Sequence, residues 1–169
     1  MPSIGSGRLR LVALTLRQLE LCLTDLPALE DELGCPVSRD VFDENVRRAL
    51  KMKMVKMSGV EAARHDWFTY WLVILRENDA GVGLTGFKGG PDAGGSVEIG
   101  YGISPQYRGR GLMGEAVRAL VDWAFGHPEC RSVTATHVTK SASRRLLEKL
   151  GARPVRQDAE SSSWKIDKG

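Results

Sequence analysis

The sequence predicts an α/β protein with a mixed sheet that contains antiparallel hairpins and one strand–helix crossover. Three observations support this class. Short apolar runs with strand-like patterning recur along the chain, turn signals join several of them, and a strongly periodic helix lies between two later strands. The expected order of elements is β-α-α-β-β-β-α-β-α-β-β. We expect one domain over residues 1–169, because neither a linker nor an internal repeat interrupts the chain.

The N-terminal third is expected to contain one strand and two helical segments. Residues 8–16 alternate loosely between apolar and polar and predict a strand. Residues 19–33 place apolar side chains at helical spacing, with an interruption at Pro27 and an end at Gly34. Residues 39–57 predict one longer helix, because apolar residues recur there at three- and four-residue steps. These apolar residues are Phe42, Val46, Ala49, Leu50 and Met54.

The middle of the chain predicts three consecutive strands. Residues 67–76 are apolar on both faces, which indicates a central strand. Residues 80–88 alternate, so that residues 77–79 form a hairpin turn. The glycine-rich segment 89–95 is a loop, and residues 96–103 form the next strand.

The C-terminal part alternates helices and strands. Residues 111–125 have the most regular helical pattern in the chain, and a glycine and a proline end this helix. Its apolar stripe is Met113, Ala116, Val117, Leu120, Val121 and Ala124. Residues 132–138 predict a strand, and residues 141–150 predict a helix closed by a glycine. The segments 155–157 and 162–166 predict a final, weaker hairpin.

Composition and charge argue against several classes of protein. Hydrophobic residues make up 42% of the chain and charged residues 27%, with a formal net charge of +3. This excess is too small to indicate nucleic acid or an anionic membrane as a partner. Cys22, Cys35 and Cys130 form no C-x-x-C pair, which argues against a disulfide framework or a metal site. We expect a cytoplasmic protein, because no signal-peptide core and no membrane-length apolar run is present.

In the segment VEIGYGI at 97–103, one face of the expected strand has lost all its side chains except one carboxylate. Glu98, Gly100 and Gly102 share this face, because side chains alternate along a strand. Glycines weaken a strand, and a common reason for them is the close approach of a ligand or of another backbone. The alternative is that a helix packs tightly on this face and that Glu98 forms a structural ion pair.

The segment that follows this strand predicts a phosphate site. Q-Y-R-G-R-G at 106–111 leads directly into a helix, whose first N–H groups are unpaired and favour an anion. Gly109 and Gly111 let this backbone approach the anion, and Arg108 and Arg110 add positive charge at its rim. A Rossmann fingerprint is excluded because no acidic residue ends a strand about 20 residues later, and a P-loop because no G-K-[ST] follows.

These motifs resemble the GNAT superfamily of acyl-CoA-dependent N-acyltransferases. Q-x-x-G-x-G at 106–111, preceded by EIGYGI, resembles the pyrophosphate loop of that family, and SASRRLLEKLGA at 141–152 is similar to its second cofactor-contacting helix. The opening GRLRLVALTLRQLELCL is similar to the branch that contains ribosomal-protein N-terminal acetyltransferases. The resemblance implies a mostly antiparallel central sheet flanked by helices, with a splayed pair of strands that holds the cofactor.

The resemblance also implies site residues. Acetyl-CoA would be the co-substrate, and its pyrophosphate would be held by the backbone from Arg108 through Gly114, which comprises Arg108, Gly109, Arg110, Gly111, Leu112, Met113 and Gly114. Ile103 and Ser104 would pair with the pantetheine amides. Lys140 stands where the family commonly has an asparagine that contacts the cofactor, and a lysine could instead reach a phosphate.

The implied reaction is acetyl transfer to a primary amine by direct attack in a ternary complex. Glu98 would be the catalytic base, and Ser143 would contact the sulfur or donate a proton, because the family's tyrosine is replaced by Leu147. A modest base suits a protein N-terminus or another low-pKa amine better than a lysine. The substitutions at Leu147 and Lys140 leave open a non-catalytic acyl-CoA-binding module, and the glycine loop leaves open a nucleotide-binding protein.

Three further expectations concern the acceptor site, the assembly and an additional base. The resemblance implies that residues 25–66 and the last hairpin build the acceptor site, and it allows a homodimer. His137 is a weaker candidate for an additional base.

Overall fold

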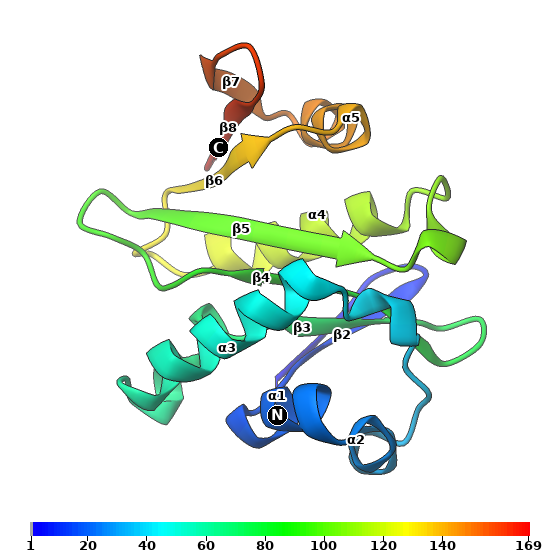
Figure 1. Cartoon of the computed structure of the whole chain (residues 1–169). Helices are drawn as coiled ribbons and strands as arrows, with labels where there is room; N and C mark the ends of the chain where they lie inside the picture. The colour runs from blue at the N-terminus through cyan, green and yellow to red at the C-terminus, as the bar shows by residue number, and fades with distance from the viewer. Residues whose placement is uncertain (1) are drawn as a thin grey trace.

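The computed structural model of the chain describes residues 2–169 (Figure 1). Within this range the strands form an eight-stranded sheet. Every neighbouring pair is antiparallel except β5 and β6, which run parallel, so the predicted α/β class with a mostly antiparallel sheet is confirmed. The spatial order is β1 (Ser3–Gly5), β2 (Leu9–Ala13), β3 (Trp71–Leu75), β4 (Ala80–Phe87), β5 (Ser96–Ile103), β6 (Ser132–Val138), β8 (Ser162–Asp167) and β7 (Arg153–Gln157).

Helices cover both faces of the sheet. They are α1 (Leu16–Thr24), α2 (Leu26–Leu33), α3 (Glu44–Ser58), α4 (Leu112–Phe125) and α5 (Ser141–Lys149), with short 3-10 turns at 39–41, 62–67 and 105–107. In Figure 1 α3 lies in front of the strands and α4 lies behind β5. Each face has its own apolar core, one shared with α1 to α3 and the other with α4 and α5. The predicted stripe of α4 is buried in the second core, as expected.

The first helical segment divides at Asp25 rather than at Pro27. Thr15 caps α1 in a reciprocal capping box with Gln18. Because the helix begins here, β2 ends at Ala13, earlier than the strand expected over residues 8–16. Asp25 then caps α2 by accepting a hydrogen bond from the N–H of Ala28 at 3.1 Å. Pro27 lies within the first turn of α2, where no N–H donor is required, so it begins a helix instead of interrupting one.

Two other boundaries differ from the expected ones. The helix expected at 39–57 begins only at Glu44, because Asp43 accepts from the N–H of Val46 and acts as its N-cap. The strand expected from residue 67 begins at Trp71, since residues 62–67 form a 3-10 turn. The short strand β1 was not predicted, because three residues are too few to show a period.

The parallel pair of strands separates along its length. β5 and β6 are paired only at Ser96 with Ser132, Val97 with Val133 and Glu98 with Thr134. Beyond this point β6 turns away from β5, and a bulge against β8 places His137 in the left-handed region with φ 54°. The starts of α4 and α5 lie on the two sides of the opening (Figure 1). The sheet is therefore splayed at the place where the sequence predicts a bound cofactor.

Candidate active site

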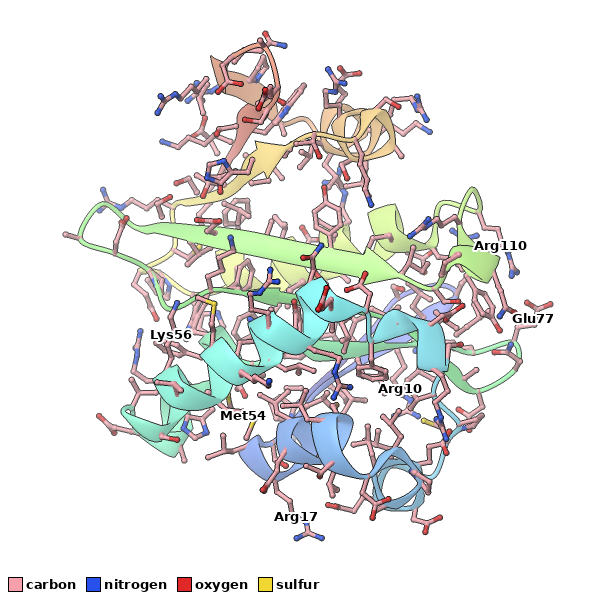
Figure 2. The ribbon with its side chains drawn as sticks, in the orientation of Figure 1. Arg10, Arg17, Met54, Lys56, Glu77 and Arg110 are labelled. Carbon is pink, nitrogen blue, oxygen red and sulfur yellow. The ribbon has the colours of Figure 1, made fainter. Side chains whose placement is uncertain are left out.

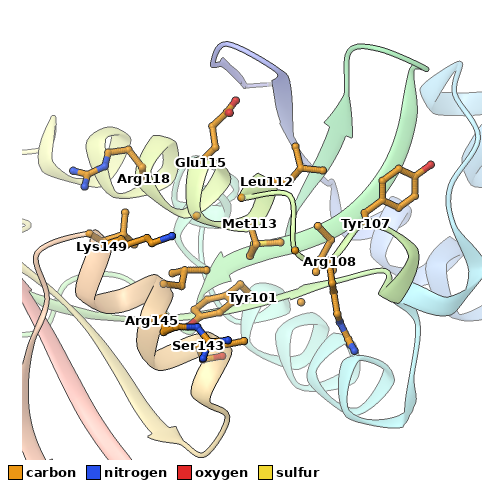
Figure 3. Close-up of a pocket in the computed structure, with 18 of the residues that line it drawn as sticks. Tyr101, Tyr107, Arg108, Leu112, Met113, Glu115, Arg118, Ser143, Arg145 and Lys149 are labelled. Atoms are coloured by element: carbon orange, nitrogen blue, oxygen red, sulfur yellow. The ribbon is translucent and has the colours of Figure 1, made fainter.

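A groove of about 680 Å³ occupies the opening between β5, the start of α4 and α5 (Figure 3). It contains most of the residues that the sequence singles out for cofactor binding. These are Ile103, Arg108, Gly109, Gly111, Leu112, Met113, Gly114, Lys140 and Ser143. Segments that are distant in the sequence, the loop at 105–111 and helix α5, thus form one surface.

The lining of the groove is strongly basic. Its cationic side chains are Arg108, Arg118, Lys140, Arg145 and Lys149, and its acidic side chain is Glu115. Among the described residues 2–169, none of these five cations takes part in an ion pair. The groove can therefore attract a ligand with several negative charges, although the net charge of the whole chain is small.

Two helices begin at the groove, and the N-terminus of each has no side-chain cap. Gly111 is the N-cap of α4 and adopts φ 73°, and Gly109 adopts φ 78°, a backbone region that residues with a Cβ rarely enter. A Cβ at Gly109 would meet no atom within 4 Å, so the space beside this loop is open. The unpaired N–H groups at the start of α4 can therefore donate to an anion in the groove.

The edge of β5 offers hydrogen-bonding groups to the groove at alternate residues. The backbone carbonyl of Glu98 accepts from the backbone N–H of Lys88, and the backbone N–H of Ser104 donates to the carbonyl of Val82 at 2.8 Å, so the even-numbered residues bond to β4. The backbone groups of Tyr101 and Ile103 consequently point toward the opening.

Ser104 differs from the expectation that it pairs with the cofactor. Its N–H is already used within the sheet, its side chain is 0% exposed, and its Oγ has no hydrogen-bond partner in the described structure. Ser104 is also not among the residues that line the groove. Of the two residues predicted to pair with the pantetheine, only Ile103 is placed to do so.

Arg110 also differs from the expectation, because its charge faces away from the groove. Its guanidinium donates to Glu77 at 3.2 Å and lies 5.8 Å from the centre of the Tyr107 ring. Figure 2 shows Arg110 and Glu77 together at the outer edge of the molecule. Arg110 contributes its backbone to the loop, whereas its side chain is already paired. No sequence pattern indicates this partner, since Glu77 lies in a turn 33 residues earlier.

Glu98 lies where β5 and β6 separate, on the face of the sheet opposite α4. Its carboxylate accepts from the hydroxyl of Thr136 at 2.8 Å and forms an ion pair with Lys88. Partial burial raises the pKa of Glu98, but the hydrogen bonds from Lys88 and Thr136 and the charges of Lys88 and His137 outweigh it and hold the pKa below its usual value. Glu98 is therefore ionised at neutral pH and is a weak base.

The glycines beside Glu98 leave space on its face of the sheet. A Cβ added to Gly100 or to Gly102 would meet no atom within 4 Å. The alternative of a helix packed tightly on these glycines is therefore excluded within the described structure. An acceptor molecule can approach the end of the groove along this face.

Tyr101 is a residue of the groove that sequence reasoning missed. Its alternation with Glu98 indicates a core residue, but the splaying of the strands exposes its ring to the groove beside Ser143 (Figure 3). Burial raises the pKa of Tyr101, and a hydrogen bond with Ser143 partly offsets this. Leu147 is 1% exposed and packs in the core, so its position supplies no polar group to the groove.

Comparison with known proteins agrees with this geometry. Residues 8–153 match the model of the acetyltransferase (GNAT) domain. This chain belongs to the GNAT acetyltransferase family. The splayed strands and the glycine loop are thus the features that the resemblance implies, and the chain is an acyltransferase.

Individual GNAT relatives cover nearly the whole chain. "Uncharacterized N-acetyltransferase YjdG" of Bacillus subtilis (strain 168) is 28% identical over 160 residues, which are 89% of this chain and 92% of that protein. A solved acetyltransferase from Salmonella typhimurium, described as modifying the N-terminal serine of ribosomal protein L7/L12, has a TM-score of 0.66 at 15% identity and covers 99% of this chain and 100% of that one. RimL in complex with coenzyme A has a TM-score of 0.64 at 14% identity, covering 98% of both chains. At 14% and 15% identity, the two solved structures show that this chain shares their fold, and they show nothing about its substrate.

Three other features that a site could use are a membrane-spanning helix, a cluster of metal ligands and a reactive thiol. Across residues 2–169, no helix is long and apolar enough to cross a membrane, and no group of three metal-ligating side chains lies together. Cys22, Cys35 and Cys130 are free and buried, and burial raises the pKa of each thiol, that of Cys22 to about 12. These thiols are therefore poor nucleophiles.

Proposed function

We propose that this GNAT protein transfers an acetyl group from acetyl-CoA to a primary amine by direct attack in a ternary complex. The acceptor would be a protein N-terminus or a small-molecule amine of similarly low pKa. The observation that supports this most strongly is the basic groove at the uncapped start of α4, together with Glu98 on the open face of the sheet where β5 and β6 separate. The groove offers a site for a polyanion, and the open face offers an approach for an amine.

The residues of the groove fit coenzyme A. The backbone N–H groups from Arg108 to Gly114 would hold the pyrophosphate, since the positive φ of Gly109 and Gly111 shapes the turn that exposes these groups. Arg118, Arg145 and Lys149 would neutralise the remaining phosphate charge. Ile103 would pair with the pantetheine amides through its free backbone groups.

The chain's own residues would divide the chemistry between them. When bound, acetyl-CoA supplies the thioester carbonyl that the amine attacks. Glu98 would accept the proton of the amine through water, because it lies on the open face and not in the lining of the groove. Tyr101 and Ser143 would stand beside the sulfur and donate a hydrogen bond to it. A strong acid is not required, since a thiol with a pKa of about 8.5 can leave as the thiolate.

The acceptor class follows from the weakness of the base. Glu98 has a lowered pKa, so its ability to remove a proton from a strongly basic amine is small. An N-terminal amine has a pKa of about 7.8 and is partly neutral near pH 7, whereas a lysine with a pKa of about 10.4 is almost fully protonated. The names of the ribosomal-protein acetyltransferases among the similar structures also favour an N-terminal acceptor.

Release of free thiol from acetyl-CoA tests this function. The acceptors are a peptide with a free N-terminus, the same peptide blocked at its N-terminus but containing a lysine, and a set of small primary amines. We expect turnover with the free N-terminus or with a small amine of low pKa, and little with the blocked peptide. Tight binding of acetyl-CoA without turnover on any acceptor would instead support a non-catalytic acyl-CoA-binding module, which the replacement of the family's tyrosine by Leu147 favours.

A further inference from the structure

A carboxylate lies within the groove that is otherwise lined by cations. Glu115 is in the first turn of α4 and lines the groove. A bare negative charge at this place would repel the phosphates of a bound nucleotide. In the structure this carboxylate accepts three hydrogen bonds from the N-terminal hairpin, as follows: from the Ser6 hydroxyl at 2.6 Å, and from the backbone N–H and the Nε of Arg8, each at 2.8 Å. Figure 3 shows Glu115 pointing from α4 toward the blue strands of that hairpin.

Arg8 joins Glu115 to the loop at the start of α4. While its Nε donates to Glu115, its Nη1 donates to the carbonyl oxygen of Arg110 at 2.8 Å. Its Nη2 would lie 3.5 Å from a Cβ placed on Gly111. One guanidinium therefore contacts both the carboxylate in the groove and the two-glycine turn that exposes the N–H groups.

The loop depends on such contacts for its shape. Two of its residues, Gly109 and Gly111, are glycines at positive φ, and glycine loses the most conformational freedom when it is fixed. On the outer side the β3–β4 turn holds the loop through Asn78, which donates to the Tyr107 hydroxyl at 3.0 Å, and through Glu77 on Arg110. On the inner side the described contacts come from Arg8.

We propose that Arg8 is a positioning residue for cofactor binding, which neutralises Glu115 and fixes the carbonyl of Arg110 so that the phosphate loop is held ready by the N-terminal hairpin. This proposal rests on the proposed use of acetyl-CoA. Arg8 acts through Glu115 and the loop, and it does not itself contact the phosphates. It follows that the loss of acetyl-CoA affinity on removing Arg8 depends on whether Glu115 keeps its charge.

A double-mutant cycle tests this dependence. Arg8→Ala should weaken acetyl-CoA binding at least tenfold in calorimetry, because it leaves Glu115 charged and without its guanidinium partner beside the phosphates. Arg8→Ala combined with Glu115→Gln should bind at least threefold more tightly than Arg8→Ala alone. Arg8→Lys keeps the charge but cannot bridge two acceptors in a fixed fork, so it should be intermediate. Arg17→Ala is the matched control, since it removes a similar arginine–carboxylate pair, 3.0 Å from Glu32, away from the groove.

Two further readouts separate positioning from general damage to the fold. In turnover, Arg8→Ala should raise KM for acetyl-CoA at least tenfold and leave kcat within threefold of the wild type. In the free protein, hydrogen exchange at residues 108–111 should be faster in Arg8→Ala than in the wild type and in Arg17→Ala.

The outcomes are distinct. Binding by Arg8→Ala within twofold of the wild type, or a double variant no tighter than Arg8→Ala, would overturn the proposal, and the second result would point to a direct contact of Arg8 with the ligand. Unchanged exchange at residues 108–111 would overturn the role of Arg8 in fixing the loop. Failure of the wild type itself to bind acetyl-CoA would refute the proposed function, while the exchange measurement would still decide whether Arg8 holds the loop.

Discussion

At the scale of single residues, Glu98 is a carboxylate held between Lys88 and Thr136 where β5 and β6 separate. Because its pKa is lowered, the carboxylate form persists to pH values below the usual pKa of a glutamate and is lost only in more acidic solution. The base form of Glu98 is therefore present throughout the range in which an N-terminal amine titrates. The pH dependence of turnover should accordingly report on the amine and not on Glu98.

We expect Glu98→Gln to lower turnover by about 10²-fold where the amine is protonated, below about pH 7.8. The deficit should shrink at higher pH, where the amine is already neutral and needs no base. The affinity for acetyl-CoA should not change, since Glu98 does not line the groove. The measurement is kcat/KM for an N-terminal peptide against pH. Lys88→Met is the companion variant: it should raise the pKa of Glu98 and move to higher pH the separate, more acidic decline that protonation of Glu98 causes, while the titration of the amine stays in place. A profile of Glu98→Gln that matches the wild type would remove Glu98 from the mechanism.

Lys53 is a buried cation in a different place, on the buried face of α3. It is 7% exposed, donates to the carbonyls of Phe68 and Phe87 at 3.2 and 2.8 Å, and lies 4.4 Å from the centre of the Tyr70 ring. Burial, together with the charges of Lys56 and Lys88, lowers the pKa of Lys53 to about 7. In the unfolded chain a lysine titrates near pH 10.4.

The unfolded state therefore binds more protons than the folded state between about pH 7 and pH 10.4, so the free energy of unfolding should rise with pH across this window. Urea unfolding of the wild type and of Lys53→Met at about pH 6.5 and pH 9.5 checks this, and the wild type should gain up to about 3 kcal/mol relative to the variant. A constant difference between the two proteins would show that Lys53 keeps its charge in the folded state over the whole range.

At the scale of elements, the start of α4 is the part on which cofactor binding depends. Gly111→Val places a β-branched residue at φ 73° in the N-cap, a conformation that such residues rarely adopt. We expect at least tenfold weaker binding of acetyl-CoA, because the turn must rearrange and withdraw the N–H groups from the groove.

Gly34→Val provides the matched control for this change. Gly34 has φ 72° at the end of α2, far from the groove in the chain and not among its lining residues. It should destabilise the protein by a similar amount and leave the dissociation constant of acetyl-CoA unchanged. Equal affinities in calorimetry for Gly111→Val and Gly34→Val would contradict the role of the turn.

The elements that were predicted well are those whose signal is local. The period of α4, the turn at 77–79 and the glycines of the loop follow from neighbouring residues, and the structure has each of them. Helix boundaries were less accurate, since Asp25 and Asp43 act as caps through single hydrogen bonds that apolar spacing does not reveal.

The site could be predicted only where its residues belong to one motif. The glycine loop and the position of Ser143 in α5 were found in this way, and the groove contains both. The pairing of Arg110 with Glu77, the burial of Ser104 and the exposure of Tyr101 in the groove depend on contacts between distant segments. Neither spacing nor composition encodes such contacts, so sequence reasoning missed all three.

At the scale of the whole molecule, the groove joins two parts of the sheet that are linked by only a short stretch of strand pairing within the described residues. β6, β8 and β7 with α5 meet the remaining sheet through three residue pairs between β5 and β6. A ligand that contacts both the start of α4 and α5 would therefore connect them. Because such a ligand binds the folded state only, acetyl-CoA at 100 times its dissociation constant should stabilise the protein by about 2.7 kcal/mol.

For a chain of this size that stabilisation corresponds to a rise in Tm of about 5 to 10 °C. Thermal unfolding followed by circular dichroism at increasing acetyl-CoA concentration measures it. Coenzyme A should give a similar rise and ATP a smaller one, since ATP lacks the pantetheine arm. An equal or larger rise with ATP would favour a nucleotide-binding protein instead.

The most direct test of the central claim is a crystal structure of the complex with acetyl-CoA. We expect pyrophosphate oxygens within hydrogen-bonding distance of the N–H groups between Arg108 and Gly114, pantetheine alongside Ile103, and the thioester next to Tyr101 and Ser143. Density for the ligand elsewhere, or a groove closed by its own side chains at saturating acetyl-CoA, would refute the proposed binding mode.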